Sequence, residues 1–434
     1  MTTDTTIEIN SSEGMMRAVL VGLQLPQTRN FDHSMEELRA LAEACHYKAA
    51  AIYTQNAASV NTAFYIGTGK VTEIKTSVEN LEANCVIFDE SLSPIQLRNL
   101  TDTLSCTVLD RTLLILNIFG DRAKTAEAKL QVELANLQYM LPRLVGMHAS
   151  LSRQGGASGS MSNKGTGEKK LELDKRHIEH RITELKKSLA DVSKNRATAR
   201  KQRQKSGLKK VALVGYTNAG KSTIMNWMVQ SYGAQDEKTV LEKDMLFATL
   251  DTSIRKIEPE NMPPFLLSDT VGFIERLPHD LVNAFHSTLE EAQYSDLILL
   301  VVDASDEYAS QQIQVTLDTL KQLGASDIPR LYLYNKSELV RDPFTLPFCS
   351  NDRIYFSAKE KTGMDMLLSL IIERLYPDRK ECEFLLPLCR GDILHILFDH
   401  AFIHAYEYRP DGIFCKCSCE NDIIMKFEQY IVSK

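Results

Sequence analysis

The sequence predicts an α/β fold, and three observations indicate it. Short apolar runs such as Val211–Val214 and Leu297–Val302 alternate with amphipathic stretches, as expected for a doubly wound sheet. One of these runs leads into a glycine-containing loop that opens a helical pattern. The composition, 44% hydrophobic and 25% charged, is typical of a globular protein. Because 434 residues are too many for one hydrophobic core, we expect several domains.

The glycine-containing loop has the spacing of a P-loop. It reads GYTNAGKST, with glycines at the first and sixth positions followed by Lys-Ser. Glycines allow backbone N–H groups and the positive end of the next helix to surround a phosphate. Lys221 is expected on the β and γ phosphates and Ser222 on Mg²⁺. The predicted phosphate-binding residues are Gly215, Tyr216, Thr217, Asn218, Ala219, Gly220, Lys221, Ser222 and Thr223.

A second phosphate-side motif follows the apolar run Phe265–Leu267. An aspartate at the end of a strand suits a water-mediated Mg²⁺ contact, and a glycine N–H can approach the γ-phosphate and move away after hydrolysis. Asp269 is therefore predicted to serve the metal and Gly272 the reaction, together with Lys221. The motif comprises Asp269, Thr270, Val271 and Gly272.

Two later motifs fit a guanine base. After strand Leu331–Tyr334, the Glu338 carboxylate can accept from guanine N1–H and the exocyclic amine, a pairing that adenine does not offer. The backbone after strand Ile354–Phe356 can donate to guanine O6. The base-side residues are Asn335, Lys336, Glu338, Ser357, Ala358 and Lys359. The order of all these motifs resembles translational GTPases, in which Asp is usual where Glu338 stands, so we expect guanine preference with weaker binding.

The residue after Gly272 has a consequence for catalysis. Many GTPases carry a water-orienting Gln there, but Phe273 has no hydrogen-bonding group. GTPases with Asn at the position of Asn218 and an apolar residue after this glycine often use K⁺ where others use an arginine finger. We therefore expect Asn218 to contribute to catalysis, with slow basal hydrolysis accelerated by K⁺ or by a partner. Plain core packing of Phe273 is an equally compatible interpretation.

The pattern also predicts where the domains begin and end. We expect a disordered N-terminus, an N-terminal α/β subdomain, an antiparallel helical hairpin with a glycine-rich tip, a P-loop G domain, and a small α+β C-terminal domain. Their predicted ranges are 1–14, 15–125, 126–207, 208–376 and 377–434.

In the N-terminal segment, apolar runs and amphipathic stretches indicate a small βαβ-type sheet. Strands are predicted at Met16–Gly22, Ala49–Tyr53 and Cys85–Phe88, and helices at Ser34–Cys45 and Lys70–Asn80. The stretch Phe64–Lys70 (FYIGTGK) has two glycines and a lysine but lacks P-loop spacing. We interpret it as a strand-to-helix turn rather than a second nucleotide site.

Apolar residues at spacings of four and three predict the hairpin. They are Leu130, Leu134, Leu137, Leu141 and Leu144, then Ile178, Ile182, Leu185, Leu189 and Val192. The first helix is expected to end near Met140–Leu141, because Pro142 lacks a donor and disfavours helix before it. The glycine-rich stretch Leu151–Glu168 is expected to be a mobile tip.

The second helix of this hairpin is strongly basic. Between Lys164 and Lys210 there are sixteen Lys or Arg and six Asp or Glu, a local balance of +10 in a chain of net charge −7. Such a segment fits a polyanion such as structured RNA. A solvated basic helix is the alternative, and charge alone does not decide between them.

For the C-terminal segment we predict strands at Phe384–Leu388 and Gly412–Cys419 and helices at 391–406 and Ile423–Val432. Cysteines at every second position of the second strand share one face. With nearby histidines they could bind a metal, but the spacing is not a usual zinc pattern, and small buried apolar side chains are the favoured interpretation. The residues concerned are Cys415, Cys417, Cys419, His395, His400 and His404.

Cysteine usage and hydropathy bear on location. The nine cysteines are scattered, which favours reduced thiols. No apolar run is long enough to span a bilayer, and the start MTTDTTIEINSSEG lacks a signal-peptide pattern. We therefore expect a cytoplasmic monomer with at most peripheral membrane association.

Several longer stretches together resemble HflX-type GTPases of the Obg/HflX-like branch. They are FYIGTGKV, FDESLSPIQLRNL, VLDRTLLILNIF, KLQVELANLQYMLPRL, SRQGG, GYTNAGKST, LFATLD and DTVGF. The resemblance implies the four-part fold given above. It also implies that Phe247, Ala248 and Thr249 contact the nucleotide, with Thr249 as a Mg²⁺ ligand beside Ser222 and Asp269.

The same resemblance implies partners and an activity. Such proteins bind the large (50S) ribosomal subunit and its rRNA, use GTP and GDP, and dissociate or rescue stalled ribosomes, with hydrolysis permitting release. The glycine-rich tip would reach toward the peptidyl-transferase region, although Gly167-Glu168-Lys169-Lys170 stands where Gly-Glu-Thr-Gln is common. The alternatives are a nucleotide-gated anti-association factor with negligible turnover and a dual ATP/GTP hydrolase.

Overall fold

The computed structural model describes residues 15–28, 30–154, 164–205, 207–233, 247, 253–260, 262–274, 291–340 and 346–433. The chain divides into two compact units, 1–121 with 133–184, and 122–132 with 185–434. The five domain ranges given above stay a prediction. The expected disorder of residues 1–14 lies outside the described residues. No helix in the described ranges is both long and apolar enough to cross a bilayer.

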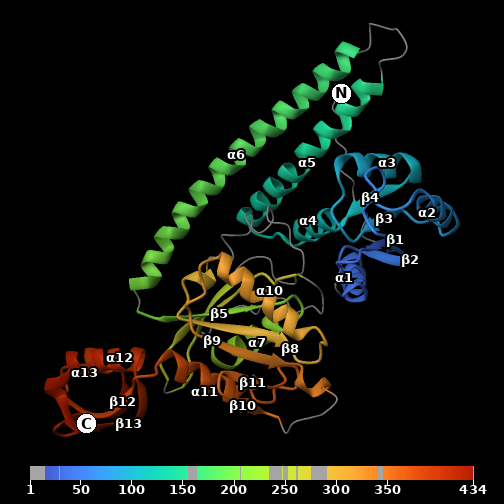
Figure 1. The fold of residues 1–434 in the computed structure, drawn as a ribbon. Helices are drawn as coiled ribbons and strands as arrows, with labels where there is room; N and C mark the ends of the chain where they lie inside the picture. Colours follow the sequence, from blue (N-terminus) through green and yellow to red (C-terminus); the bar gives the residue numbers. More distant parts are fainter. Residues whose placement is uncertain are drawn as a thin grey trace. The chain divides into compact units, whose positions relative to one another are not determined.

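The N-terminal sheet has four parallel strands in the order β2-β1-β3-β4 (Figure 1). The strands are β1 (Met16–Gln24), β2 (Tyr47–Asn56), β3 (Cys85–Phe88) and β4 (Thr107–Asp110). The helices are α1 (Phe31–Ala44), α2 (Thr68–Asn80), α3 (Pro94–Leu104) and α4 (Arg111–Arg122). Val19 and Val21 pack with α2 and α3 on one face, while Gly22 lies against Met35 of α1 on the other. The predicted strands and helices are confirmed, and α3, β4 and α4 were not predicted.

Two long helices follow, α5 (Ala126–Gln154) and α6 (Lys164–Lys205). Ion pairs join them with antiparallel polarity: Glu127 pairs with Arg196 at 3.1 Å and Glu133 with Arg181 at 2.7 Å. Every predicted seam position of α6 is at least partly buried, and Leu185 is fully buried. The antiparallel hairpin is therefore confirmed.

Two details of the hairpin prediction were wrong. Helix α5 does not end before Pro142, which lies inside it, because side chains around the proline hold that turn to the N-terminal sheet. The predicted tip 151–168 was too long, since 151–154 continue α5 and 164–168 begin α6. Residues 155–163, the centre of the expected mobile tip, lie outside the described residues.

Residues after the hairpin form a seven-stranded sheet in the order β10-β11-β9-β8-β5-β7-β6. It is mostly parallel, and its two outer strands, β6 and β10, are antiparallel. Its strands are β5 (Lys209–Gly215), β6 (Ser253–Ile257), β7 (Phe265–Asp269), β8 (Leu297–Asp303), β9 (Arg330–Asn335), β10 (Phe348–Ser350) and β11 (Arg353–Tyr355). Its described helices are α7 (Lys221–Tyr232), α10 (Ala309–Gln322), the 3-10 helix η2 (Ser337–Leu339) and α11 (Met364–Leu375).

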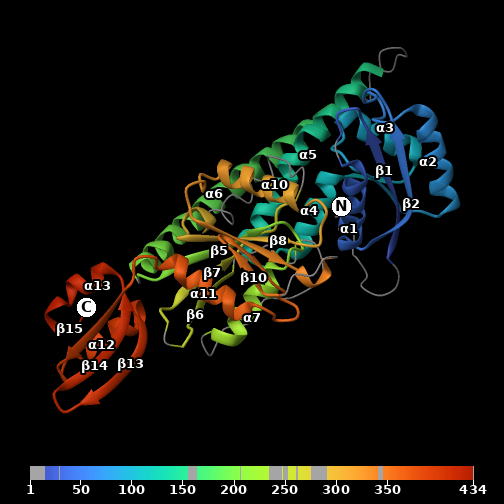
Figure 2. The same cartoon turned by 60° about the horizontal axis from the view of Figure 1, so that its bottom comes forward.

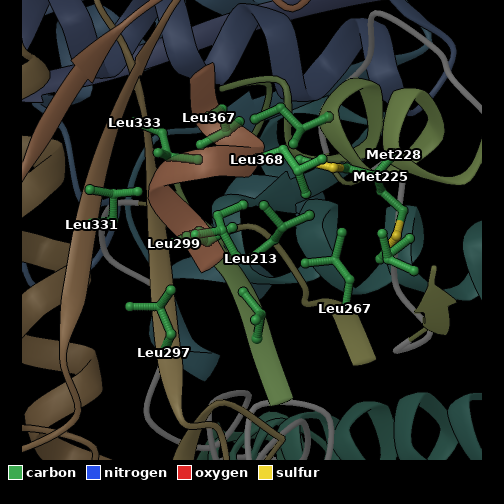
Figure 3. Packing of buried hydrophobic residues seen from close by; sticks show 14 of the residues in the cluster. Leu213, Met225, Met228, Leu267, Leu297, Leu299, Leu331, Leu333, Leu367 and Leu368 are labelled. Atoms are coloured by element: carbon green, nitrogen blue, oxygen red, sulfur yellow. The ribbon is translucent and has the colours of Figure 1, made fainter. Parts of the chain in front are cut away.

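Leucines fill the core of this sheet. Figure 3 shows Leu213, Leu267 and Leu299 from central strands packing against methionines of α7 and leucines of α11. This buried apolar layer fixes the strand ends, and therefore the loops that follow β5, β7 and β9.

The C-terminal segment is a four-stranded antiparallel sheet in the order β13-β14-β12-β15. Figure 2 shows β13 and β14 side by side. Its elements are β12 (Lys380–Leu386), α12 (Gly391–His400), β13 (Phe402–Arg409), β14 (Gly412–Cys419), α13 (Asn421–Lys426), the 3-10 helix η3 (Glu428–Tyr430) and β15 (Ile431–Ser433). The predicted helix over 391–406 was wrong beyond His400, where a strand pairing with β14 takes over. The predicted helix Ile423–Val432 was likewise wrong past Lys426.

The three cysteines of β14 face the core of this sheet. Cys415, Cys417 and Cys419 are buried among apolar side chains of β12 and α12, as small apolar residues would be. His404 Nε2 lies 2.7 Å from Ser418 Oγ. Within the described residues, no three His, Cys, Asp or Glu side chains are arranged to hold a metal ion.

Candidate functional site

The loop between β5 and α7 has a backbone conformation that few amino acids can adopt. Asn218 and Gly220 both lie in the left-handed region, with φ of 60° and 98°. A Cβ at Gly220 would collide with the Asn335 side-chain amide, and one at Gly215 would collide with the Val301 carbonyl. The two glycines of the motif are therefore required by close approach, and they leave the loop concave.

Lys221 is the buried cation of this loop. Its Nζ donates to the carbonyls of Gly215 at 3.0 Å and Tyr216 at 2.7 Å, and the residue is only 6% exposed. Burial lowers the pKa of Lys221 to about 8, while Asp269 opposes that shift. An ammonium held in this way is stabilised further by any anion that reaches it.

The ends of β7 and α7 bring two hard oxygen ligands together. Ser222 Oγ donates to Asp269 Oδ2 at 3.2 Å, and Asp269 is fully buried. Next to it, Thr270 Oγ1 donates to the Leu213 carbonyl at 2.7 Å, which ties this strand end to β5. Serine and carboxylate oxygens at this separation match what Mg²⁺ prefers, directly or through water.

Gly272 and Phe273 close the phosphate side. A Cβ at Gly272 would lie 2.8 Å from Thr217 Cα and 3.0 Å from Lys221 Nζ. Phe273 bonds to the P-loop in both directions: its N–H donates to the Gly215 carbonyl at 3.1 Å, and its carbonyl accepts from Thr217 N–H at 2.8 Å. Phe273 is also buried, so core packing is the interpretation that the structure supports for its side chain.

Asn335 connects the base-side motifs to the P-loop. Its Nδ2 donates to the Ala219 carbonyl and its Oδ1 accepts from Ala358 N–H, both at 2.9 Å. Because Ala358 N–H already donates to Asn335, the expected hydrogen bond from this backbone to guanine O6 would either share that N–H or come from Lys359. Lys336 Nζ pairs with Asp303 at 2.7 Å.

Glu338 is half-buried beside these residues. Its Oε2 is shielded from solvent and has no hydrogen-bond partner among the described residues. A buried carboxylate oxygen without a donor is costly, so a ligand that supplies N–H groups would be favoured here.

These residues line one pocket of about 700 Å³. Of the predicted residues, the following line it: Thr217, Asn218, Gly220, Lys221, Ser222, Thr223, Phe247, Thr270, Gly272, Asn335, Lys336, Glu338, Ala358 and Lys359. Not among the lining residues are Gly215, Tyr216, Ala219, Asp269, Val271 and Ser357. Ala248 and Thr249 lie outside the described residues, so the predicted role of Thr249 as a metal ligand stays a prediction.

Five lining residues were not predicted, namely Trp227, Gln230, Leu339, Glu360 and Lys361. A signal for the first two was present. Thr223, Trp227 and Gln230 follow one another at spacings of four and three, which places them on one face of α7. Leu339, Glu360 and Lys361 are close neighbours of predicted base-side residues.

The second glycine motif does not form such a loop. Gly67 N–H donates to Gln55 Oε1 at 2.9 Å just before α2 begins. Lys70 pairs with Glu73 at 2.7 Å and lies over the Tyr53 ring. The stretch is the entry into α2, in agreement with the turn interpretation.

Comparisons with known proteins agree with this architecture. Residues 32–120 match the family model described as GTP-binding GTPase N-terminal, 122–203 match GTP-binding GTPase Middle Region, and 210–336 match 50S ribosome-binding GTPase. The GTPase HflX of Caldanaerobacter subterraneus is 40% identical over 96% of this chain and 94% of its own length. The chain belongs to the HflX GTPase family.

Two further matches extend the comparison. The Escherichia coli GTPase HflX is 37% identical over 91% of each chain. A crystal structure of a GTP-binding protein from Sulfolobus solfataricus in complex with GDP is 26% identical, covering 83% of this chain and 99% of that one, with a TM-score of 0.44. As an HflX GTPase, the protein is a GTP hydrolase.

Proposed function

We propose that this HflX GTPase binds GTP in the pocket between β5, β7 and β9 and acts on the large ribosomal subunit in the cytoplasm. The observation that carries the nucleotide site is Lys221, a buried ammonium held only by two loop carbonyls among its described hydrogen bonds, at the wall of the pocket. A terminal phosphate would draw this ammonium away from the two carbonyls, because an anion is a stronger hydrogen-bond acceptor than a carbonyl oxygen.

Three residue groups would divide the work. Ser222 and Asp269 would hold Mg²⁺, which supplies charge neutralisation to the phosphates. Gly272, because it has no side chain, would allow its N–H to follow the γ-phosphate beside Lys221. Glu338 would accept hydrogen bonds from the guanine, and Asn335 would hold the base-side loops against the P-loop.

The basic hairpin supports contact with ribosomal RNA. Lys186 and Lys187 are exposed on α6 and have no ion-pair partner in the described part of the chain. Other cations of α6, such as Arg181, are engaged by carboxylates. Free lysines on a helix of high positive charge are available to phosphates. Dissociation or rescue of stalled ribosomes is the function that we propose for this contact.

The test measures phosphate release from GTP with and without 50S subunits, and sedimentation of the protein with these subunits under saturating GTP. We expect stimulated turnover in the wild type and loss of both turnover and GTP-dependent sedimentation in Lys221→Ala. A Lys221→Ala protein that sediments as well as the wild type, without dependence on nucleotide, would refute the gating of ribosome binding by GTP.

Buried Phe273 favours a second possibility, in which binding matters more than turnover. Since its side chain packs in the core and cannot orient water, intrinsic hydrolysis is expected to be slow. GTP-dependent 50S binding without stimulated turnover would support an anti-association factor. The same assay with ATP addresses dual hydrolysis.

We further propose that Asn218 assists a K⁺ ion in catalysis. Asn218 lines the pocket, is exposed and has a left-handed backbone. Turnover is measured in KCl and in NaCl for the wild type and Asn218→Ala. We expect faster turnover in KCl for the wild type alone, and equal rates in all four conditions would remove the ion from the mechanism.

A further inference from the structure

A buried polar cluster fastens α5 to the N-terminal sheet, and its centre is Asp110. This last residue of β4 is only 2% exposed. Its Oδ1 accepts from Leu113 N–H at 2.9 Å, which caps the first turn of α4. Its Oδ2 accepts from Leu92 N–H at 3.0 Å. One carboxylate therefore joins a strand end, a helix start and the loop after β3.

Two side chains of α5 complete the cluster. Tyr139 donates its hydroxyl to Asp110 Oδ2, and burial and then this carboxylate raise the pKa of Tyr139. Arg143 Nη2 donates to the Leu92 carbonyl at 3.0 Å and lies 3.3 Å from Asp110 Oδ2. The Arg143 guanidinium also stacks 3.3 Å from the centre of the Tyr139 ring. Helix α5 is thus held twice by the same loop and carboxylate.

Pro142 lies between these two contacts in a place where a helix should weaken. It has no N–H for the Gln138 carbonyl, and its ring crowds that carbonyl. Arg143 Nη1 donates to the adjacent Tyr139 carbonyl at 2.9 Å, which adds a donor in the turn where the proline removes one. The helix continues without interruption to Gln154.

We propose that Asp110, Tyr139 and Arg143 are positioning residues, which keep α5 helical through Pro142 and fix the direction in which it leaves the N-terminal sheet. The effect that we expect of this positioning on ribosome binding rests on the proposed function. A hairpin that bends at Pro142 presents its far end in many orientations, and binding then carries the entropy cost of selecting one. A hairpin held by this cluster is already oriented.

The first experiment asks whether the cluster compensates for the proline. Amide hydrogen exchange of residues 138–146 is followed by mass spectrometry in the full chain, for Tyr139→Phe, Arg143→Gln, and each combined with Pro142→Ala. Asp102→Asn, which alters an exposed carboxylate of α3, is the matched control. Because Tyr139→Phe removes one hydroxyl, the domain is expected to stay folded.

We expect Tyr139→Phe and Arg143→Gln to speed exchange in this turn by about tenfold or more, and Asp102→Asn to leave it unchanged. In the Pro142→Ala background these two substitutions are expected to speed exchange by only about threefold or less, because an alanine restores the missing backbone N–H donor. Unchanged exchange in the single variants, or the same acceleration with alanine at this position, would overturn the proposal.

The second experiment connects the cluster to function. GTP turnover without ribosomes is expected to be the same in all variants, while 50S binding falls several-fold in Tyr139→Phe and recovers in the Pro142→Ala combination. Faster exchange with wild-type 50S binding would overturn the positioning role. If the wild type itself fails to bind 50S subunits, the proposed function falls, and the exchange data still decide whether the cluster compensates for Pro142.

Discussion

The N-terminal sheet and the mostly parallel seven-stranded sheet use the carboxyl edge, the side on which their parallel strands end, in opposite ways. At the carboxyl ends of β5, β7 and β9, the loops leave a pocket of about 700 Å³, and those after β5 and β7 contain glycines. At the carboxyl ends of β3 and β4, long charged side chains occupy the corresponding place. Arg111 Nη1 lies 2.6 Å from Asp89 Oδ1, its Nη2 pairs with Glu37, and Ser34 donates to Asp89 at 2.7 Å.

The difference teaches that topology offers a ligand edge but the residues after the strands decide its use. Open α/β sheets bind ligands outside the carboxyl ends of their strands. Gly220, with positive φ, allows backbone to curve around a ligand, whereas Arg111 fills the space with its own ion pairs and is 3% exposed. The first edge can exchange a ligand, and the second stabilises the fold and holds α5.

The largest effect in this comparison is expected from Arg111→Met. It leaves Asp89 and Glu37 buried without their cation, which typically costs about 3–5 kcal/mol. Urea unfolding followed through hydrogen exchange of β3 and β4 measures the loss locally, because a chain of several domains need not unfold in one step. Arg176→Met, with a side chain 70% exposed, is the control and should change nothing measurable. Similar stability of both variants would mean that the second edge is not held by charge.

The next effect compares two Gly-Lys pairs, each at the start of a helix. A Cβ at Gly220 collides with the Asn335 amide and requires φ near +98°, so Gly220→Ala should strain the loop by about 1–3 kcal/mol. The affinity for a fluorescent GTP analogue should then fall by roughly fivefold to a hundredfold. Gly69→Ala meets no atom within 4 Å and should leave this affinity unchanged. A loss in Gly69→Ala would revive a second nucleotide site.

The sequence predicted the open edge better than the closed one, for a physical reason. A phosphate loop must combine glycines, lysine and a hydroxyl within a few consecutive positions, so Gly215 through Ser222 carry the signal locally. The pairs that close the other edge join residues far apart: Arg111 reaches Asp89 over 22 positions and Glu37 over 74. No local pattern reports that two charges distant in sequence meet in a core.

Tertiary contacts also explain the errors in secondary structure. Pro142 is a valid signal for a helix end, yet the contacts of Tyr139 and Arg143 outweigh it. In the C-terminal segment, apolar residues after His400 fit either a helix or a strand, and pairing with β14 decides for the strand. Trp227 could be placed in the pocket only once the face of α7 that lines it was known.

The smallest effect tests the open edge in its finest detail, the discrimination between bases. Glu338 lines the pocket with one buried oxygen that lacks a described donor, where guanine can supply N–H groups and adenine cannot. Glu338→Asp should strengthen binding of GTP relative to ATP by a few-fold, about 1 kcal/mol, because the shorter carboxylate need not fold back to accept both bonds. Competition between the two nucleotides measures the ratio, and Glu360→Asp, on the same pocket, should leave it unaltered. If the ratio is the same in Glu338→Asp and the wild type, the oxygen that lacks a described donor is not the base contact, and selectivity must come from the backbone around Ala358 and Lys359.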